Sequence, residues 1–403
     1  MKATCAANRN EEEQKTCWKL LLLLPRLLLR STDVTGQAGK QEYTRRYHRF
    51  LWGEWDTLLA EARAQSREQQ RRQGGAPNED RKLKQACVLV EQGELSRARQ
   101  VFTGCALAPG TAATLAALTD PERGPQQPLE RLPQEVQEYQ PPERVNLSKR
   151  LFLETLRKAP RGTAGGLAGL RFEHLKVLMD EGSGTDFLYR AAQNLARADL
   201  PTETQEVLRT GSLVALQKPD GGVRGIVVGE ALRRVTVKTL AKQYSKDFEQ
   251  ACAPFQFALS TRAGTECVAH ALQAASGLSS TLTVLSVDGI GAYDMMRRRA
   301  MLTKLKDLPR ARAALPFVRM SYGAPSTYLW QDDEGRTHTV EQGEGGEQGD
   351  PLMPALYSLG QHAALEAVQR QLQEGEHLNA FLDDVYVLCQ PERVRVLFDL
   401  LRM

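Results

Sequence analysis

The stretch AFLDDVYVL, residues 380–388, places two adjacent carboxylates, Asp383 and Asp384, inside an otherwise apolar run. Charged side chains are not left among Phe, Leu and Val without a partner or a task. The apolar residues on both sides of the pair predict two strands joined by an Asp-Asp turn. Because Asp is common in turns, an ordinary β-turn remains one interpretation of this pair taken alone.

A third carboxylate, Asp288, ends another apolar run, TLTVLSVD at residues 281–288. If this run is a strand beside the hairpin, the carboxylates of Asp288, Asp383 and Asp384 converge at one edge of a sheet and repel one another. A cation relieves that repulsion, and ligands that are all oxygen favour Mg²⁺ or Mn²⁺. Two such ions can clamp the attacking and leaving oxygens of a phosphoryl transfer.

Two further segments fit the same chemistry. Tyr293 belongs to SVDGIGAYD, residues 286–294, where its ring would lie under an incoming sugar and exclude a 2′-OH; the alternative is a core tyrosine. The stretch GEGGEQGDPLMPALY, residues 343–357, is a glycine-dense loop that runs into a helix. Because glycines let a backbone approach a ligand closely, we expect Gln348 and Gly349 to border a nucleotide and its template base. The alternative is a flexible loop before a helix.

The composition narrows the class of protein. The 403 residues carry 53 Lys and Arg against 49 Asp and Glu, so the formal charge is only +4 and any basic surface must be local. The seven cysteines are scattered and form no CxxC pair. This pattern argues against a disulfide scaffold or a zinc ribbon, and for a reducing compartment.

A leucine-rich stretch near the start, CWKLLLLLPRLLLR at residues 17–30, is interrupted by Lys19, Pro25 and Arg26. It is too short and too interrupted to span a bilayer, and the acidic run before it is wrong for a secretory signal. We therefore expect an amphipathic or packing helix, with no transmembrane helix, no signal peptide and no membrane partner. The expected location is intracellular, in the nucleus, the cytoplasm or both.

Composition and periodicity divide the chain into four parts. Residues 1–105 predict a helical N-terminal region, whose Arg-rich face is either solvated or a nucleic-acid contact. Residues 106–143 are rich in Pro and Gln and predict a linker. Residues 144–280 mix helices with a hairpin at 213–228, LVALQKPDGGVRGIVV, whose Pro-Asp-Gly centre is a turn signal. Residues 281–403 carry the carboxylates and the glycine-dense loop.

Three motifs in this order carry a resemblance to a known family. VDGIGAYD, EQGDPLMPALYSL and AFLDD strongly resemble motifs A, B and C of reverse transcriptases, nearest to those of non-LTR (LINE-like) retrotransposons. FLDD stands in place of the commoner YADD or FADD. Upstream, the hairpin at 213–228 resembles the fingers hairpin of this family, and RGTAGGLAGLRFEHLK resembles the extra N-terminal motif of non-LTR enzymes. The resemblance covers roughly residues 150 to 390.

The resemblance implies an α+β fold of the right-hand polymerase type. Fingers would occupy residues 144–280, and residues 281–403 would form a palm whose antiparallel sheet packs on helices. The implied activity is that of an RNA-directed DNA polymerase, in which the 3′-OH of a DNA primer attacks a dNTP on an RNA template. The catalytic residues would be Asp288, Asp383 and Asp384. Together with the carbonyl of Gly289, they would bind two Mg²⁺ or Mn²⁺ ions.

The nucleotide-binding residues follow from the same resemblance. Lys218 and Arg224 would hold the triphosphate from opposing strands of the hairpin through charge-assisted hydrogen bonds. Tyr293 would be the steric gate that selects deoxynucleotides, and Gln348 and Gly349 would border the nucleotide. Template and primer would lie along a basic groove. The candidates to line this groove are Arg233, Arg234, Lys238 and residues 297–299. For each of them, the alternative is a position on a solvated helix face.

The chain ends at Met403, shortly after Asp384, so we expect the thumb of such a polymerase to be missing. Two alternatives therefore stay open beside an active enzyme. One is an inactive fragment of a retroelement polyprotein, and the other is a domesticated, non-catalytic nucleic-acid-binding protein on the same fold. An RNA-dependent RNA polymerase shares the palm, but Tyr293 argues against it because ribonucleotide users keep a small or polar residue there.

Overall fold

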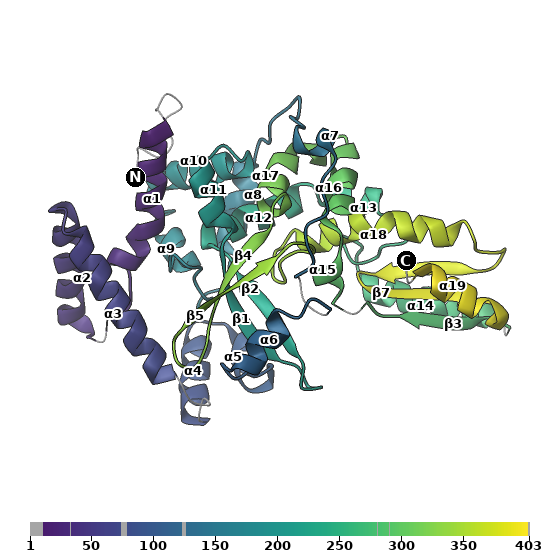
Figure 1. Ribbon diagram of the computed structural model, residues 1–403, viewed down its shortest axis with the longest axis horizontal. Helices are drawn as coiled ribbons and strands as arrows, with labels where there is room; N and C mark the ends of the chain where they lie inside the picture. Colours follow the sequence, from purple (N-terminus) through teal and green to yellow (C-terminus); the bar gives the residue numbers. More distant parts are fainter. Residues whose placement is uncertain are drawn as a thin grey trace. The chain divides into compact units, whose positions relative to one another are not determined.

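The computed structural model of the chain describes residues 11–32, 34–73, 79–122, 126–279, 281–289 and 291–401. Helices and strands are both present, so the expected α+β class is confirmed (Figure 1). The chain forms two compact units, each of which is discontinuous in sequence. Unit 1 comprises Met1–Thr119, Lys149–Thr236 and Thr327–Glu341, and unit 2 comprises Asp120–Ser148, Val237–Ser326 and Gln342–Met403.

The N-terminal helices of unit 1 pack through leucine side chains. They are α1 (Glu11–Leu28), α2 (Gly36–Leu51), α3 (Trp55–Gln73), α4 (Glu79–Glu91) and α5 (Leu95–Thr103). Leu27 and Leu28 of α1 form a buried cluster with Leu58 of α3. The leucine-rich stretch is therefore a packing helix, as expected. Every helix in the described ranges is too short or too polar to cross a membrane.

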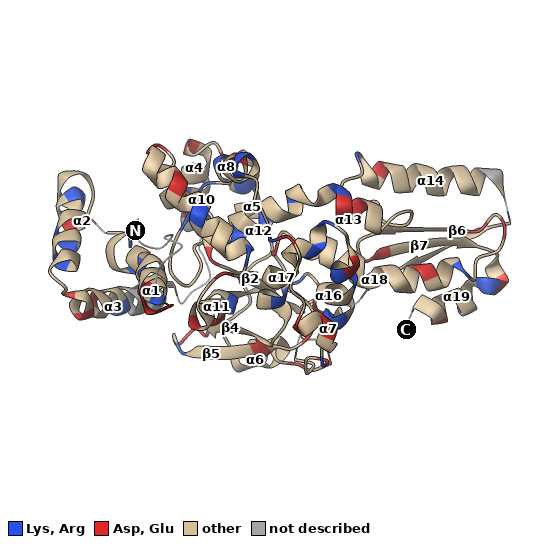
Figure 2. Cartoon of the chain, turned by 90° about the horizontal axis from the view of Figure 1, so that it is seen from above, with Lys and Arg blue, Asp and Glu red and all other residues tan. Residues whose placement is uncertain are grey.

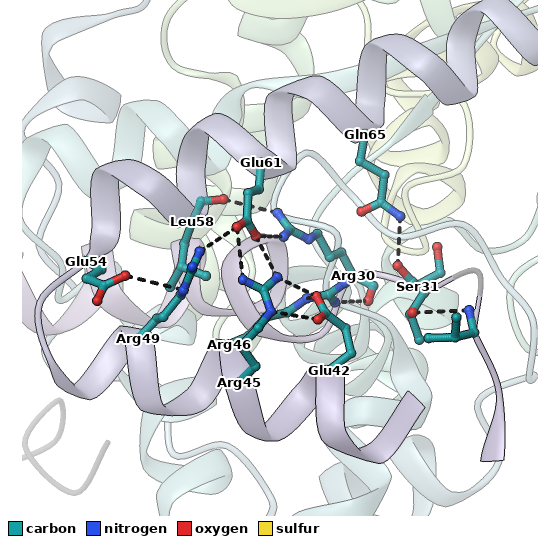
Figure 3. A network of polar contacts seen from close by, with 12 residues as sticks. Arg30, Ser31, Glu42, Arg45, Arg46, Arg49, Glu54, Leu58, Glu61 and Gln65 are labelled. Carbon is teal, nitrogen blue, oxygen red and sulfur yellow. Dashed lines mark hydrogen bonds and ion pairs between the residues drawn. The ribbon is translucent and has the colours of Figure 1, made fainter. Parts of the chain in front are cut away.

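Arginine and glutamate side chains join α2, α3 and the segment after α1 (Figure 3). Glu61 of α3 accepts a hydrogen bond from Arg30 Nη2 at 2.6 Å, and two from Arg45 of α2. Glu42 accepts two hydrogen bonds from the same Arg45 guanidinium, each at 2.7 Å. These arginines are thus engaged inside the unit. The expected Arg-rich face also includes residues 66–73, whose side chains are not among those that the structure describes.

Unit 1 also contains a four-stranded sheet in the order β2-β1-β4-β5. Its strands are β1 (Gly211–Gln217), β2 (Val223–Val228), β4 (Ser326–Gln331) and β5 (Thr337–Gln342). β1 pairs antiparallel with β2 and parallel with β4. The predicted turn between β1 and β2 is confirmed, because the Lys218 N–H donates to the Gly222 carbonyl at 2.8 Å and Gly221 has a φ of +83°.

The remaining helices of unit 1 come before β1 or after β2 in the sequence. They are α6 (Ala112–Leu118), α8 (Lys149–Arg157), α9 (Phe172–Val177), α10 (Gly182–Ala196) and α11 (Thr202–Arg209), and α12 (Ala231–Gln243) has residues in both units. Within the expected linker, residues 106–143, the chain forms α6 and α7 (Gln134–Gln137), and Leu107 makes an isolated bridge to Leu216 of β1. The division into four parts at these boundaries stays a prediction.

Unit 2 is built on a three-stranded antiparallel sheet in the order β3-β7-β6. Its strands are β3 (Thr283–Val287), β6 (His377–Phe381) and β7 (Asp384–Cys389). Besides α7 and part of α12, its other elements are α13 (Ser245–Ala251), α14 (Gly264–Leu278), α15 (Ala292–Met295), α16 (Arg298–Asp307), η2 (Ala311–Ala314), α17 (Leu315–Tyr322), α18 (Met353–Gln369), η3 (Pro391–Arg393) and α19 (Val394–Leu401).

Helices cover both faces of the unit 2 sheet. Val385 and Val387 of β7 are buried against Leu365 and Val368 of α18 and Leu397 of α19. Seen from above, α14 lies on the opposite side of β6 and β7 from α18 and α19 (Figure 2). An antiparallel sheet packed on helices is the arrangement that we expected for residues 281–403.

The ion pairs of the N-terminal helices give stability a defined pH dependence. The Arg45 guanidinium holds the pKa of the Glu42 carboxyl at about 2, below its ordinary value of 4.5. A carboxyl whose pKa is lowered by folding stabilises the folded state above the unfolded pKa, and loses that contribution as pH falls towards the folded value. We therefore expect Glu42→Gln to lower the unfolding temperature at about pH 7, and to have little effect at about pH 2.

The measurement is thermal unfolding followed by circular dichroism for wild type and variant across this pH range. Glu91→Gln makes the same charge change at an exposed position on α4, and it should leave the unfolding temperature nearly constant relative to wild type. A wild-type advantage over Glu42→Gln that is the same size at both ends of the range would contradict the assignment.

Candidate active site

The register of the unit 2 sheet brings three carboxylates to one of its ends. Asp288 directly follows β3, whose last residue, Val287, faces Val385 of β7. Asp384 is the first residue of β7 and pairs with Phe381, and Asp383 lies in the turn before it. The predicted Asp-Asp turn is therefore wrong by one residue, because Leu382 and Asp383 form the turn. In an antiparallel pair, the residue after Val287 lies alongside the residue before Val385. Residues from two distant parts of the sequence therefore meet at the same end of the sheet.

The three carboxylates form one electrostatic group. Asp288 and Asp384 are exposed, and Asp383 is half-buried. Desolvation raises the pKa of the Asp384 carboxyl, and the negative charges of Asp383 and Asp288 raise it further. A β-carbon placed on Gly289 would lie 3.8 Å from the Asp383 β-carbon and 3.3 Å from that of Ala292, so Gly289 stands directly beside the turn.

Tyr293 lies close to this group. Burial raises the pKa of the Tyr293 hydroxyl to about 12, and the charge of Asp383 adds to the effect. Its ring contacts that of Tyr357 of α18, with the centroids 5.3 Å apart and the planes inclined by 50°. Burial and the same Asp383 charge also raise the pKa of Tyr357. Sequence reasoning missed Tyr357, although it ends the quoted stretch GEGGEQGDPLMPALY.

The glycine-dense loop packs against the segment that carries Tyr293. The Gly345 N–H donates to the Met296 carbonyl and the Gly346 N–H to the Tyr293 carbonyl, each at 2.8 Å. Gly345 has a φ of +70°, and a β-carbon there would clash with the Asp294 carbonyl. Residues 342–347 are buried, which contradicts the alternative of a flexible loop. These glycines permit a close approach between two segments of the protein.

Gln348 and Gly349 follow where this loop opens to solvent. The Gln348 amide donates to the Asp294 carboxylate at 3.0 Å, and Asp294 lies in the first turn of α15. Gly349 is exposed and has a φ of +109°. The loop and the Tyr293 segment are therefore joined through both backbone and side-chain hydrogen bonds.

Arg298 and Glu344 hold this arrangement from inside, and sequence reasoning missed both roles. The Arg298 side chain is fully buried and donates to the Gly345 carbonyl at 2.7 Å, the Ala324 carbonyl at 2.8 Å and Ser326 Oγ at 3.0 Å. The Glu344 carboxylate, also buried, accepts from the Arg298 N–H at 2.7 Å. Each buried charge is thus satisfied by hydrogen bonds.

The prediction that Arg298 and Arg233 line a basic groove is wrong. Arg298 is engaged in the interior, and Arg233 is also buried, at 2% exposure. Arg234 is half-buried, donates to the Ala164 carbonyl at 2.7 Å and lies over the Phe172 ring. Sequence runs of arginine do not reveal which guanidinium groups form hydrogen bonds inside the fold. The exposed members of the predicted set are Lys238, Arg297 and Arg299.

Lys218 and Arg224 belong to the β1–β2 hairpin of unit 1. Arg224 is exposed and faces Leu216 in the register, and Lys218 is half-buried two residues beyond Leu216. Side chains two apart along a strand point to the same face, so this register places both cations on one side of the hairpin. That placement agrees with the device expected from the sequence, and their role stays a prediction.

The donor atoms of the carboxylate cluster suit a hard divalent cation, since all of them are oxygens. In the part of the chain that the structure describes, no group of three or more Asp, Glu, His or Cys side chains is oriented to hold a metal ion. Desolvation is the main cause of the raised pKa of the Asp384 carboxyl, and the negative charges of Asp383 and Asp288, which a cation would offset, add to it. The residues present therefore fit such an ion in type and charge.

Replacing Arg298 should strongly destabilise the protein. We expect Arg298→Met to lower the free energy of unfolding by at least about 3 kcal/mol, because it leaves buried carbonyl groups without partners. The matched control is Arg299→Met, whose half-exposed side chain pairs with Glu130 at 2.6 Å and should cost about 1 kcal/mol or less. Urea denaturation measures both, and equal losses for the two variants would contradict the role given to Arg298.

Comparison with known proteins supports the resemblance carried by the motifs. No family model matches the chain. Over 239 residues, 59% of the chain, it is 26% identical to the retrotransposable element SLACS 132 kDa protein of Trypanosoma brucei gambiense. The chain covers about 20% of the length of that relative.

Similar solved structures include two telomerases. The apo telomerase of Candida tropicalis, truncated from its C-terminal domain, has a TM-score of 0.37 and 14% identity, covering 48% of this chain and 46% of that one. The telomerase of Candida albicans in complex with a TWJ fragment of telomeric RNA has a TM-score of 0.38 and 11% identity, covering 50% and 41%. The similarity to the retrotransposon protein supports a region like the reverse transcriptase of a non-LTR retrotransposon in this chain, as its motifs predicted.

Proposed function

We propose that this chain is the reverse transcriptase region of a non-LTR retroelement. It would transfer a deoxynucleotidyl group from a dNTP to the 3′-OH of a DNA primer on an RNA template, with release of pyrophosphate. The observation that carries the proposal is the meeting of Asp288, Asp383 and Asp384 at one end of the sheet, with Tyr293 beside them. The similarity to a retrotransposable element protein supports it at the level of the family.

The role of the carboxylates would be to bind metal ions. Asp288 and Asp383 would hold two Mg²⁺ or Mn²⁺ ions together with the Gly289 carbonyl, and Asp384 would stand beside them. When bound, such ions activate the attacking primer oxygen and neutralise the charge on the triphosphate. The remaining contribution of the protein is positioning, because phosphoryl transfer asks little covalent chemistry of the side chains.

Tyr293 would select the sugar. Its packing on Tyr357 and its hydrogen-bonded backbone fix where the ring lies, so the ring can act as a wall rather than a mobile side chain. A fixed wall rejects a 2′-OH by steric exclusion. The segment that carries Tyr293 also binds Gln348 through Asp294, so the sugar wall and the nucleotide border belong to one hydrogen-bonded assembly.

The triphosphate and the nucleic acids would be bound by cations. Lys218 and Arg224 on one side of the β1–β2 hairpin are suited to the triphosphate, since charge-assisted hydrogen bonds to phosphate are strong. Template and primer would be held mainly through their backbones, with a salt-dependent affinity. An intracellular location, in the nucleus or cytoplasm, accords with these partners.

Replacing the carboxylates tests the proposal directly. We expect Asp383→Asn and Asp288→Asn to lower primer extension by about 1,000-fold, because each removes several kcal/mol of charge stabilisation. Asp384→Asn should have a smaller effect, and Asp399→Asn, an exposed acid on α19, should have none. The assay is extension of a DNA primer on homopolymer RNA with dNTPs and Mg²⁺.

Two results would count against catalysis. One is undiminished extension by Asp383→Asn. The other is a wild-type chain that binds RNA with a strong salt dependence but incorporates no dNTP, which would favour the non-catalytic binding protein.

Replacing Tyr293 tests the sugar selection. Tyr293→Val removes the ring, so we expect the ratio of ribonucleotide to deoxynucleotide incorporation to rise by about tenfold or more. Tyr357→Phe keeps the neighbouring ring and should leave the ratio unchanged. Parallel single-nucleotide extension assays give the ratio, and equal ratios for wild type and Tyr293→Val would refute a gate at this position.

A further inference from the structure

The turn that carries Asp383 has an unusual backbone. Leu382, the residue before Asp383, has a φ of +56°. This left-handed conformation is unfavourable for a residue with a side chain, and leucine lacks the polar group that helps Asn or Asp to adopt it. A backbone held in such a conformation persists only where its surroundings over-determine it. The question is which group holds Leu382.

One buried side chain binds both peptide groups of Leu382. The Leu382 N–H donates to Gln256 Oε1 at 2.7 Å, and Gln256 Nε2 donates to the Leu382 carbonyl at 3.4 Å. Gln256 is only 5% exposed. Its amide therefore takes the place of a neighbouring strand at a turn residue that has no strand partner.

The backbone around Gln256 is itself fixed to β6. The Ala380 N–H donates to the Phe255 carbonyl, and the Phe257 N–H donates to the Ala380 carbonyl, each at 2.9 Å. Gln256 thereby forms a parallel bridge with Ala380, two residues before Leu382. A side chain anchored on both sides in this way has little freedom to release the turn.

We propose that Gln256 is a positioning residue that sets the place of Asp383 by holding both peptide groups of Leu382. The peptide bond from Leu382 to Asp383 is planar, so fixing the Leu382 carbonyl also fixes the Asp383 backbone N–H. The assignment rests on the proposed function only in calling Asp383 catalytic.

The chemistry of the site selects glutamine. Its amide presents an acceptor for the Leu382 N–H and, beside it, a donor for the Leu382 carbonyl. Glutamate would keep the acceptor but lose the donor, and would add a negative charge near three others. Asparagine is one methylene shorter, and methionine matches the length without forming either hydrogen bond.

Amide hydrogen exchange in the metal-free protein tests the clamp without relying on activity. We expect Gln256→Met to speed exchange at the Leu382 amide by at least about tenfold, because that amide loses its acceptor. Exchange along β7, from Val385 to Leu388, should change little. Unchanged exchange at Leu382 would overturn the proposal, whether or not the chain proves to be a polymerase.

The chain offers a matched control in the same unit. The half-buried Gln243 also makes a double contact with the backbone, in which Oε1 accepts from the Ser148 N–H at 2.9 Å and Nε2 donates to the Asn146 carbonyl at 3.1 Å. Gln243→Met should therefore cost similar thermal stability but leave exchange at Leu382 unchanged. Faster exchange at Leu382 in both variants would show general destabilisation and would also overturn the proposal.

A second measurement separates positioning from simple loss of fold. If the wild type extends primers, Gln256→Met should lower kcat at least about tenfold and raise the Mg²⁺ concentration for half-activation, while the KM for dNTP stays within about twofold. Adding Leu382→Gly should restore part of kcat, because glycine adopts a positive φ without a clamp. A Gln256→Met enzyme with wild-type kcat and Mg²⁺ dependence would refute the positioning role.

Discussion

Three carboxylates repel one another at one end of the sheet, and the surrounding structure must offset this repulsion. Asp288, Asp383 and Asp384 stay together because the sheet register leaves them no other place. A slip of one residue between β3 and β7 would turn the buried valines of β7 towards the opposite face. The apolar core under β7 therefore fixes the position of the charges.

A second set of buried charges holds the glycine-dense loop at residues 342–347 in place. Arg298 and Glu344 both lie in the interior. Arg298 donates to the Gly345 and Ala324 carbonyls, and Glu344 accepts from the Arg298 and Glu130 N–H groups. Burying ions in this way is rarely the most stable solution. The hydrogen bonds of Arg298 to Gly345 and of Glu344 to Arg298 nevertheless tie this loop to the start of α16. The segments that carry Tyr293 and Gln348 are thereby held in a single arrangement.

Local sequence signals predicted the elements whose causes are local. The Pro-Asp-Gly centre predicted the turn after Lys218, and the paired acids between apolar runs predicted the β6–β7 hairpin. The interior hydrogen bonds of Arg298, the backbone packing of Gly345 and the clamp by Gln256 were not predictable. Each depends on a partner far away in the sequence, and nothing in an arginine, glycine or glutamine alone identifies that partner.

The discontinuity of unit 2 has a consequence for the order in which it folds. β3 has β7 as its sheet neighbour, and β7 lies close to the C-terminal end of the chain. During synthesis from the N-terminus, the edge of β3 must therefore wait while the hairpin of β4 and β5 and the long α18 are made. An unpaired strand edge is a place where chains associate wrongly, so β3 is the part of this sheet that is open to such association over this interval.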